Sequence, residues 1–159
     1  MREVPVGRQG LVALVDDEDY DVAMQHTWGV VRSPQGVVYA RRQWWEGEHR
    51  KAQKMHNFIT GWPCVDHRDH DGLNNQRQNL RRATDSQNQA NQRVRRTGSS
   101  EYRGVSWHRR RGDWGSRIRV DGRLIHLGYF TDEIEAARAY DSAARERFGD
   151  FACVNFADE

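Results

Sequence analysis

The sequence has few cysteines, few lysines and no long apolar run, and each shortage argues against a class of protein. Cys64 and Cys153 lie far apart, so they form neither a zinc-binding Cys-x-x-Cys pair nor a dense disulfide scaffold. A reducing, cytoplasmic location is therefore the default expectation. No stretch of 18 or more apolar residues occurs, so we expect no membrane span. The first ten residues, MREVPVGRQG, have no apolar centre of the kind that a secretory signal needs.

Apolar residues are also scarce for a chain of this length. Hydrophobic residues make up 36% of the 159 residues, and the mean hydropathy is -0.99. One large core is therefore not expected, and two small modules with aromatic-rich cores fit the composition better. Six tryptophans favour this arrangement, because each can bury a large apolar area.

Positive charge is concentrated in one segment and is carried almost entirely by arginine. All the basic residues except Lys51 and Lys54 are arginines, and the net charge is only +2. Residues 77–126 contain thirteen arginines, no lysine and four acids, an excess of nine positive charges. Arginine binds phosphate and guanine through two hydrogen bonds, so this block predicts a nucleic-acid surface. The alternative is a solvated charged face with local ion pairs.

The pattern of residues 1–92 predicts short strands and short helices. We expect strands at 10–16 and 36–45 and helices at 16–28 and 50–61, the second ending at Gly61. Residues 62–92 predict an extended stretch, a loop over 68–75, a strand at 79–83 and a helix. Thr84 and Gln87 form a capping-box pattern, so this helix should begin near Asp85 and reach about Arg93.

Residues 93–101 are basic and then small and polar, which predicts either a plain linker or an arm that tracks DNA. The remainder predicts a three-stranded sheet packed on one helix, an α+β fold. The strands are expected at 102–110, 113–120 and 123–130. The helix is expected at 132–148, capped by Thr131 or Asp132, with an apolar stripe of Ile134, Ala137, Tyr140, Ala144 and Phe148.

Carboxylates, imidazoles and carboxamides gather in the stretch VDHRDHDGLNNQRQNLRRATDSQNQAN, residues 65–91. Phosphodiester hydrolysis needs a hard cation on the phosphate and a base that takes a proton from water. Asp66 and His67 are adjacent at a strand end, so one side chain can hold a metal while the other faces water. Asn88 can offer a carboxamide oxygen to the metal, and Asn79 can fix the loop. Loops of this composition are also often solvated turns.

The spacing of this stretch resembles the HNH endonucleases, in particular the phage and intron branch. The shared elements are DH at 66–67, NN at 74–75, NL at 79–80, AT at 83–84 and QN at 87–88. The resemblance covers about residues 5–92. It implies a ββα-metal (His-Me finger) module with one divalent ion, Mg²⁺ or alternatively Mn²⁺ or another. It also implies His67 as the general base, Asn79 as its orienting residue, and Asp66 and Asn88 as metal ligands. His56 is expected to contact DNA phosphate, or alternatively to pack inside the module.

Residues 102–156 resemble the Apetala-two domain of plant ethylene-response factors. The shared elements are YRGV, a Trp before RIRV, LGYF followed by Thr131, AARAYDSAA and VNF. The resemblance implies a three-stranded sheet that reads the DNA major groove. Ser106 and the length of the first hairpin depart from the plant pattern, so a target sequence cannot be transferred. The implied DNA-binding residues, some of which could touch only phosphates, are Arg103, Arg109, Arg110, Trp114, Arg117, Arg119, Arg123 and His126.

Together these features predict a metal-dependent, homing-type endonuclease that nicks double-stranded DNA. The expected domains are a nuclease at 1–92 with its ββα core at about 62–92, a basic linker at 93–101, and a DNA-binding domain at 102–156. We expect a monomer, with a dimer as the alternative, no nucleotide cofactor and no membrane partner. The location would be the host cytoplasm if the chain is phage-encoded. The rivals are a non-catalytic sequence-specific DNA-binding regulator with a decayed HNH fold, an RNA-binding or RNA-cutting protein, and a protein-interaction module.

Overall fold

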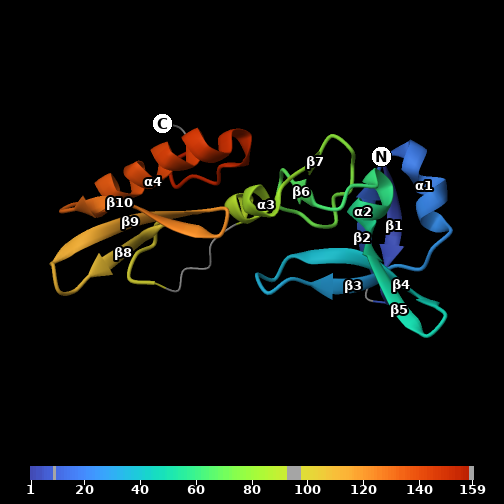
Figure 1. Cartoon of the computed structure of the whole chain (residues 1–159). Helices are drawn as coiled ribbons and strands as arrows, with labels where there is room; N and C mark the ends of the chain where they lie inside the picture. The colour runs from blue at the N-terminus through green and yellow to red at the C-terminus, as the bar shows by residue number, and fades with distance from the viewer. Residues whose placement is uncertain (9, 93–97, 158–159) are drawn as a thin grey trace. The chain divides into compact units, whose positions relative to one another are not determined.

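A computed structural model describes residues 1–8, 10–92 and 98–157 of the chain (Figure 1). The chain forms two compact units, Met1–Thr84 and Asp85–Glu159. Both contain antiparallel sheets and helices, which confirms the α+β class. The domain boundaries predicted from the sequence stay a prediction. Most of the predicted linker, residues 93–97, lies outside the described residues.

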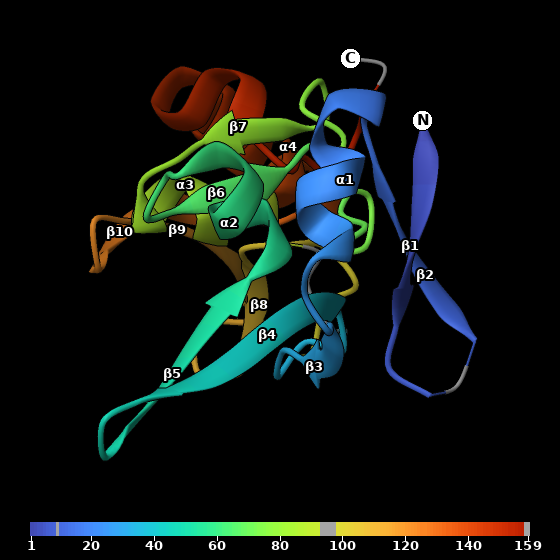
Figure 2. The ribbon, with the colours of Figure 1, turned by 90° about the vertical axis from the view of Figure 1, so that its right-hand side faces the viewer.

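The first unit is built from three small antiparallel sheets and two short helices (Figure 2). The sheets pair β1 with β2, β3 with β4 and β5, and β6 with β7. A mainly aliphatic core that includes Val4, Val15, Trp28 and Met55 is formed mainly by residues of β1, β2, α1, β4 and α2. The elements are β1 Arg2–Val6, β2 Leu11–Val15, α1 Asp17–Met24, β3 Gly29–Arg32, β4 Val38–Glu46, β5 His49–Lys54, α2 Met55–Thr60, β6 Val65–His67 and β7 Leu80–Arg82.

The prediction of one helix over 50–61 is wrong in its first half. His49–Lys54 forms strand β5, and helix α2 begins only at Met55. Pairing explains the difference, because β5 bonds to β4 in a register that runs from Glu46↔His49 to Arg41↔Lys54. This ladder outweighs the helix preference of Lys, Ala and Gln. The predicted end is confirmed, since Gly61 ends α2 in the left-handed conformation, with φ of 69°.

The second unit contains the predicted three-stranded sheet and its helix. Strand β9 lies between β10 and β8, and α4 packs against all three strands. Asp132 is the N-cap of α4, and its carboxylate accepts a hydrogen bond from the Glu135 N–H at 3.2 Å. The elements are α3 Asp85–Asn91, β8 Val105–His108, β9 Asp113–Val120, β10 Arg123–Phe130, α4 Glu133–Phe148 and the 3-10 turn η1 Gly149–Phe151.

The predicted apolar stripe of α4 is correct at four of its five positions. Ala137, Tyr140, Ala144 and Phe148 are buried against the sheet, whereas Ile134 is 41% exposed. Ile134 lies in the first turn, and the neighbouring Ala136 and Ala137 are the residues that fill the core there. The stripe is therefore structural, as the composition of the helix predicts.

Candidate nucleic-acid interface

The sheet of the second unit has one face packed on α4 and one face open. Along β9, Ser116 and Ile118 are buried while Arg117 and Arg119 are exposed, as the alternation of a half-buried strand requires. The register carries this alternation to β10, where His126 pairs with Arg117 and Leu124 pairs with Arg119. These outward positions are called the open face below. Helix α4 lies along the other side of the sheet (Figure 1).

An aromatic and cationic group occupies one end of the open face. The Tyr129 ring lies 4.4 Å from the ring centre of His126 and 5.5 Å from that of His108. The guanidinium carbon of Arg111 lies 4.1 Å above the Tyr129 ring, and Arg111 is paired with Asp113 at 2.9 Å. These contacts hold flat, polar-edged side chains in fixed positions on a solvent-facing sheet.

The structure places five of the predicted DNA-binding residues on or beside this face. Arg117, Arg119 and His126 are exposed outward residues of β9 and β10. Arg109 and Arg110 are exposed in the turn between β8 and β9. Arg119 donates to the Gly122 carbonyl at 2.9 Å, which steadies it without neutralising its charge. Such arginines can reach phosphate oxygens or guanine edges.

Two predicted residues belong to the opposite face of the sheet. Trp114 packs with the buried Val105, Ala136 and Ala137, and its ring meets that of Trp107 edge-on at 5.0 Å. Arg123 pairs with Val120 at the start of β10, which places it on the helix side of the register. Their predicted DNA contacts stay a prediction, and the packing of Trp114 argues for a structural role.

Arg103 is engaged within the second unit. Its guanidinium donates to the carbonyl of Gln89 at 2.9 Å and to the carbonyl of Gln92, both at the end of α3. The last carbonyls of a helix lack intrahelical partners and attract positive charge, so Arg103 acts as a C-terminal cap for α3. Its predicted role in DNA binding stays a prediction.

Sequence reasoning missed several residues of the open face. His108 and Tyr129 form the aromatic group, and Ser106 and Leu124 share their outward register. Period-two alternation carried from Arg117 to the neighbouring strands would have found Ser106, His108 and Leu124 but not Tyr129. The irregularity in pairing between His126 and Gly128 shifts that count by one residue, and nothing in the sequence shows it except the glycine.

In the first unit, the predicted metal ligand Asp66 is buried in an ion pair. Asp66 is 4% exposed, and its Oδ2 accepts hydrogen bonds from Nε and Nη2 of Arg81, both at 2.7 Å. Strands β6 and β7 bring the pair together, because Asp66 lies opposite Arg81 in their register. Removal of either partner would leave a buried charge without its counter-ion, so the two side chains depend on each other.

His67 is buried and packs with the buried His56 and the partly exposed Tyr39. Its ring centre lies 4.8 Å from that of His56 and 5.8 Å from that of Tyr39. Burial lowers the pKa of His56 to about 2, helped by the neighbouring charges of His67 and Lys54. Burial also lowers the pKa of His67, against the opposing effect of nearby carboxylates. His56 is 4% exposed, so its predicted contact with DNA stays a prediction that this position disfavours.

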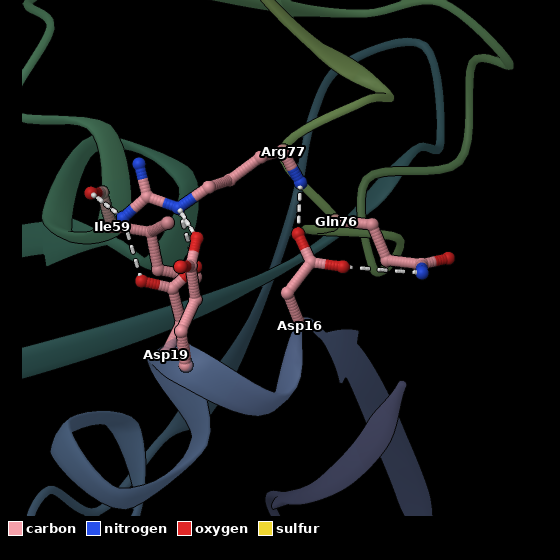
Figure 3. A network of polar contacts seen from close by, with 6 residues as sticks. Asp16, Asp19, Ile59, Gln76 and Arg77 are labelled. Atoms are coloured by element: carbon pink, nitrogen blue, oxygen red, sulfur yellow. Dashed lines mark hydrogen bonds and ion pairs between the residues drawn. The ribbon is translucent and has the colours of Figure 1, made fainter.

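Asn79 orders the loop that follows β6. Its Nδ2 donates to Asp69 Oδ1 at 2.9 Å and to the Asn74 carbonyl at 2.8 Å, and its Oδ1 accepts from the Asp69 N–H at 3.1 Å. Arg77 holds the far side of this loop (Figure 3). Its guanidinium donates to the Asp19 carboxylate of α1 at 2.7 Å and 2.9 Å, and its backbone N–H donates to the Asp16 carboxylate. These contacts give the loop a fixed shape.

The predicted metal ligands Asp66 and Asn88 lie on β6 and α3. Asp66 is already paired with Arg81 of β7. Within residues 1–8, 10–92 and 98–157, no group of three His, Cys, Asp or Glu side chains is arranged to hold a metal. The ion and its ligands therefore stay a prediction. No helix in the described part of the chain is long and apolar enough to cross a membrane.

No model of a protein family matches the chain. Curated proteins similar to it are plant transcription factors. APETALA2-like protein 2 of Oryza sativa is 48% identical over 61 residues, which is 38% of this chain and 14% of that protein. TOE2 of Arabidopsis thaliana, an AP2-like ethylene-responsive transcription factor, is 48% identical over 61 residues, 38% of this chain and 13% of that protein. Dehydration-responsive element-binding protein 2A of Oryza sativa is 51% identical over 59 residues, 36% of this chain and 21% of that protein. The chain thus spans a small part of these relatives.

These relatives correct the prediction of an enzyme. They are DNA-binding regulators, and they overturn the assignment of the chain as an HNH endonuclease. Nothing in the comparisons supports an HNH part, so the β6, β7 and α3 elements are not shown to be a nuclease module. The region of the DNA-binding domain is similar to AP2-type transcription factors, and its sheet and helix are compatible with that domain.

Proposed function

We propose that this chain is a sequence-specific, non-catalytic binder of double-stranded DNA, which reads its site with the open face of the second unit. The observation that carries the proposal is the outward placement of Arg117, Arg119 and His126 on a sheet that helix α4 covers on one side only. The similarity of this region to transcription factors and to an element-binding protein supports it.

The chemistry of the open face suits duplex DNA better than RNA. A two-stranded or three-stranded ribbon can enter the wide major groove of B-form DNA, where arginine distinguishes guanine by its O6 and N7. The major groove of A-form RNA is too deep and narrow for side chains to read. The exposed Arg109 and Arg110 in the adjacent turn can reach the flanking phosphates.

The test is selection of binding sites from a randomised duplex library, followed by affinity measurements by fluorescence anisotropy. We expect one enriched motif and weaker binding to the same sequence as double-stranded RNA. Arg117→Gln and Arg119→Gln should each weaken binding about 5- to 100-fold at the enriched site, since a base or phosphate contact is lost.

Arg147→Gln is the matched control, because Arg147 is an exposed arginine in the last turn of α4 and undergoes the same change of charge. It should reduce affinity much less than the open-face variants. A selection that enriches no motif, or equal losses for all three variants, would contradict reading by the open face.

A further inference from the structure

The hairpin of β4 and β5 in the first unit has one face with an unusual composition. The register pairs Arg41 with Lys54, Gln43 with Ala52 and Trp45 with Arg50. Successive residues of a strand point to opposite sides, so these six side chains share one side of the hairpin. They are called the Trp45 face below. The tip of the hairpin projects away from the body of the first unit (Figures 1 and 2).

Trp45 is the most exposed tryptophan of the chain, at 70%. In the described part of the chain its ring makes no aromatic or cation–π contact. Trp44 behaves differently on the other side of the hairpin, where it is 39% exposed and lies 4.9 Å from the guanidinium carbon of Arg42. Trp45 therefore offers a large exposed ring beside the cationic residues of the same face.

The Trp45 face is cationic and carries no acid from β4 or β5. Arg41, Arg50 and Lys54 supply three positive charges. Arg50 donates to the neutral Gln43, and Lys54 lies 4.2 Å from the ring centre of Tyr39, so neither charge is cancelled. On the opposite side, Lys51 is paired with Glu46 at 3.5 Å. The charged occupant that complements the Trp45 face is therefore an anion with several charges.

We propose that the Trp45 face is a second DNA-binding surface, which contacts the backbone of the same duplex that the open face reads. A two-stranded β-ribbon fits the major groove. Its arginines would neutralise phosphates, and the Trp45 ring would pack on the sugars. This surface goes beyond the proposed function because it lies in the first unit. The choice of duplex DNA as its ligand rests on the proposed function. The contribution of this surface is to affinity at all sequences, because phosphates carry no base identity.

The test is the salt dependence of binding of the full chain to a fluorescent duplex. Each lost phosphate contact lowers the magnitude of the slope of log K against log salt by about 0.9. The double variant Arg41→Gln/Arg50→Gln should therefore reduce the magnitude of the slope by about 1.8. Lys51→Gln should leave the slope unchanged. Trp45→Ala should weaken binding more than Trp44→Ala does, because only Trp45 belongs to the Trp45 face.

The outcomes separate this proposal from the proposed function. If Arg41→Gln/Arg50→Gln and Trp45→Ala bind like Lys51→Gln while Arg117→Gln weakens binding, the Trp45 face is not a DNA surface and the open face is. If only the hairpin variants weaken binding, the proposed function fails and the second surface stands. If the chain binds single-stranded DNA of equal length more tightly than the duplex, and Trp45→Ala removes this preference, the ligand of the Trp45 face is single-stranded and not duplex DNA. Unchanged urea midpoints show that each variant is folded.

Discussion

The carboxylate of Asp141 fixes the C-terminal segment of the chain by accepting hydrogen bonds from Asn155 and Phe156. Asp141 is buried on α4, and it accepts hydrogen bonds from the Asn155 N–H at 2.8 Å and the Asn155 side-chain amide at 2.9 Å. The Phe156 N–H also donates to it, at 2.9 Å. Asn155 in turn accepts a hydrogen bond from the Arg103 N–H at 2.6 Å, so this contact joins the start of the sheet, the helix and the end of the domain.

Asp141→Ala should lower the free energy of unfolding of the second unit by about 2–5 kcal/mol. The substitution leaves the partly buried N–H groups of Asn155 and Phe156 without an acceptor, and hydrogen bonds to a charged group are among the stronger ones. Urea unfolding gives the value. Asp141→Asn keeps one acceptor oxygen and should lose less. Equal stability of Asp141→Ala and the wild type would show that the segment is held by its apolar contacts alone.

Gly104→Ala should destabilise the second unit by about 2–4 kcal/mol. Gly104 has a φ of +76°, and a methyl group there would lie 2.1 Å from the Tyr140 ring and 2.6 Å from the Arg117 carbonyl. Backbone strain and overpacking both oppose the change. Gly112→Ala is the matched control, because Gly112 has a φ of +71° but open space around it. A similar loss for both variants would mean that backbone strain, and not the contact with Tyr140, dominates.

Arg81→Met should destabilise the first unit by about 3–5 kcal/mol, because it leaves the buried Asp66 carboxylate without its guanidinium. The double variant Asp66→Asn/Arg81→Met removes both charges and should recover a large part of the loss. Thermal unfolding of the four proteins in this cycle measures the coupling. Additive losses in the double variant would contradict an energetically coupled pair.

Acid should destabilise the first unit through its buried histidines. The pKa of His56 is about 2 in the folded state, well below its usual 6.5, and that of His67 is also lowered. The unfolded chain thus binds more protons than the folded chain below pH 6.5. The free energy of unfolding is therefore unaffected by the protonation of these two histidines above pH 6.5 and decreases as the pH falls below it. Each such histidine contributes a slope that approaches about 1.4 kcal/mol per pH unit.

Urea unfolding at pH 7.5, 6.5, 5.5 and 4.5 measures this dependence. His56→Gln removes one titrating group, so its slope between pH 5.5 and 4.5 should be smaller by about 1.4 kcal/mol per pH unit. His49→Gln is the matched control, because it makes the same substitution at an exposed histidine of the hairpin. If His56→Gln and the wild type respond identically to acid, His56 is not buried in its neutral form.

Much of the second unit could be predicted from its sequence, because its signals are local. Alternation of buried and exposed residues predicts β9, and turn dipeptides separate the strands. The N-cap Asp132 and the apolar stripe that includes Ala137 and Tyr140 predict α4. The first unit was harder. The helix preference of residues 50–54 is overruled by pairing with β4, which no local pattern reveals. Likewise, Asp66 forms its ion pair with Arg81, fifteen residues away. The sequence analysis counts Arg81 only as one arginine of the basic segment 77–126.

The positions of the lysine side chains allow the hairpin of β4 and β5 to be labelled selectively. Lys51 and Lys54 are the only lysines of the sequence, and both lie on β5, while the terminal amine of Met1 is paired with Asp17 at 2.9 Å. Burial lowers the pKa of Lys54. Amine-reactive dyes or crosslinkers would therefore attach to the first unit and spare the second unit, which contains no lysine, so a reporter can be placed on the hairpin without any chemical change to the open face.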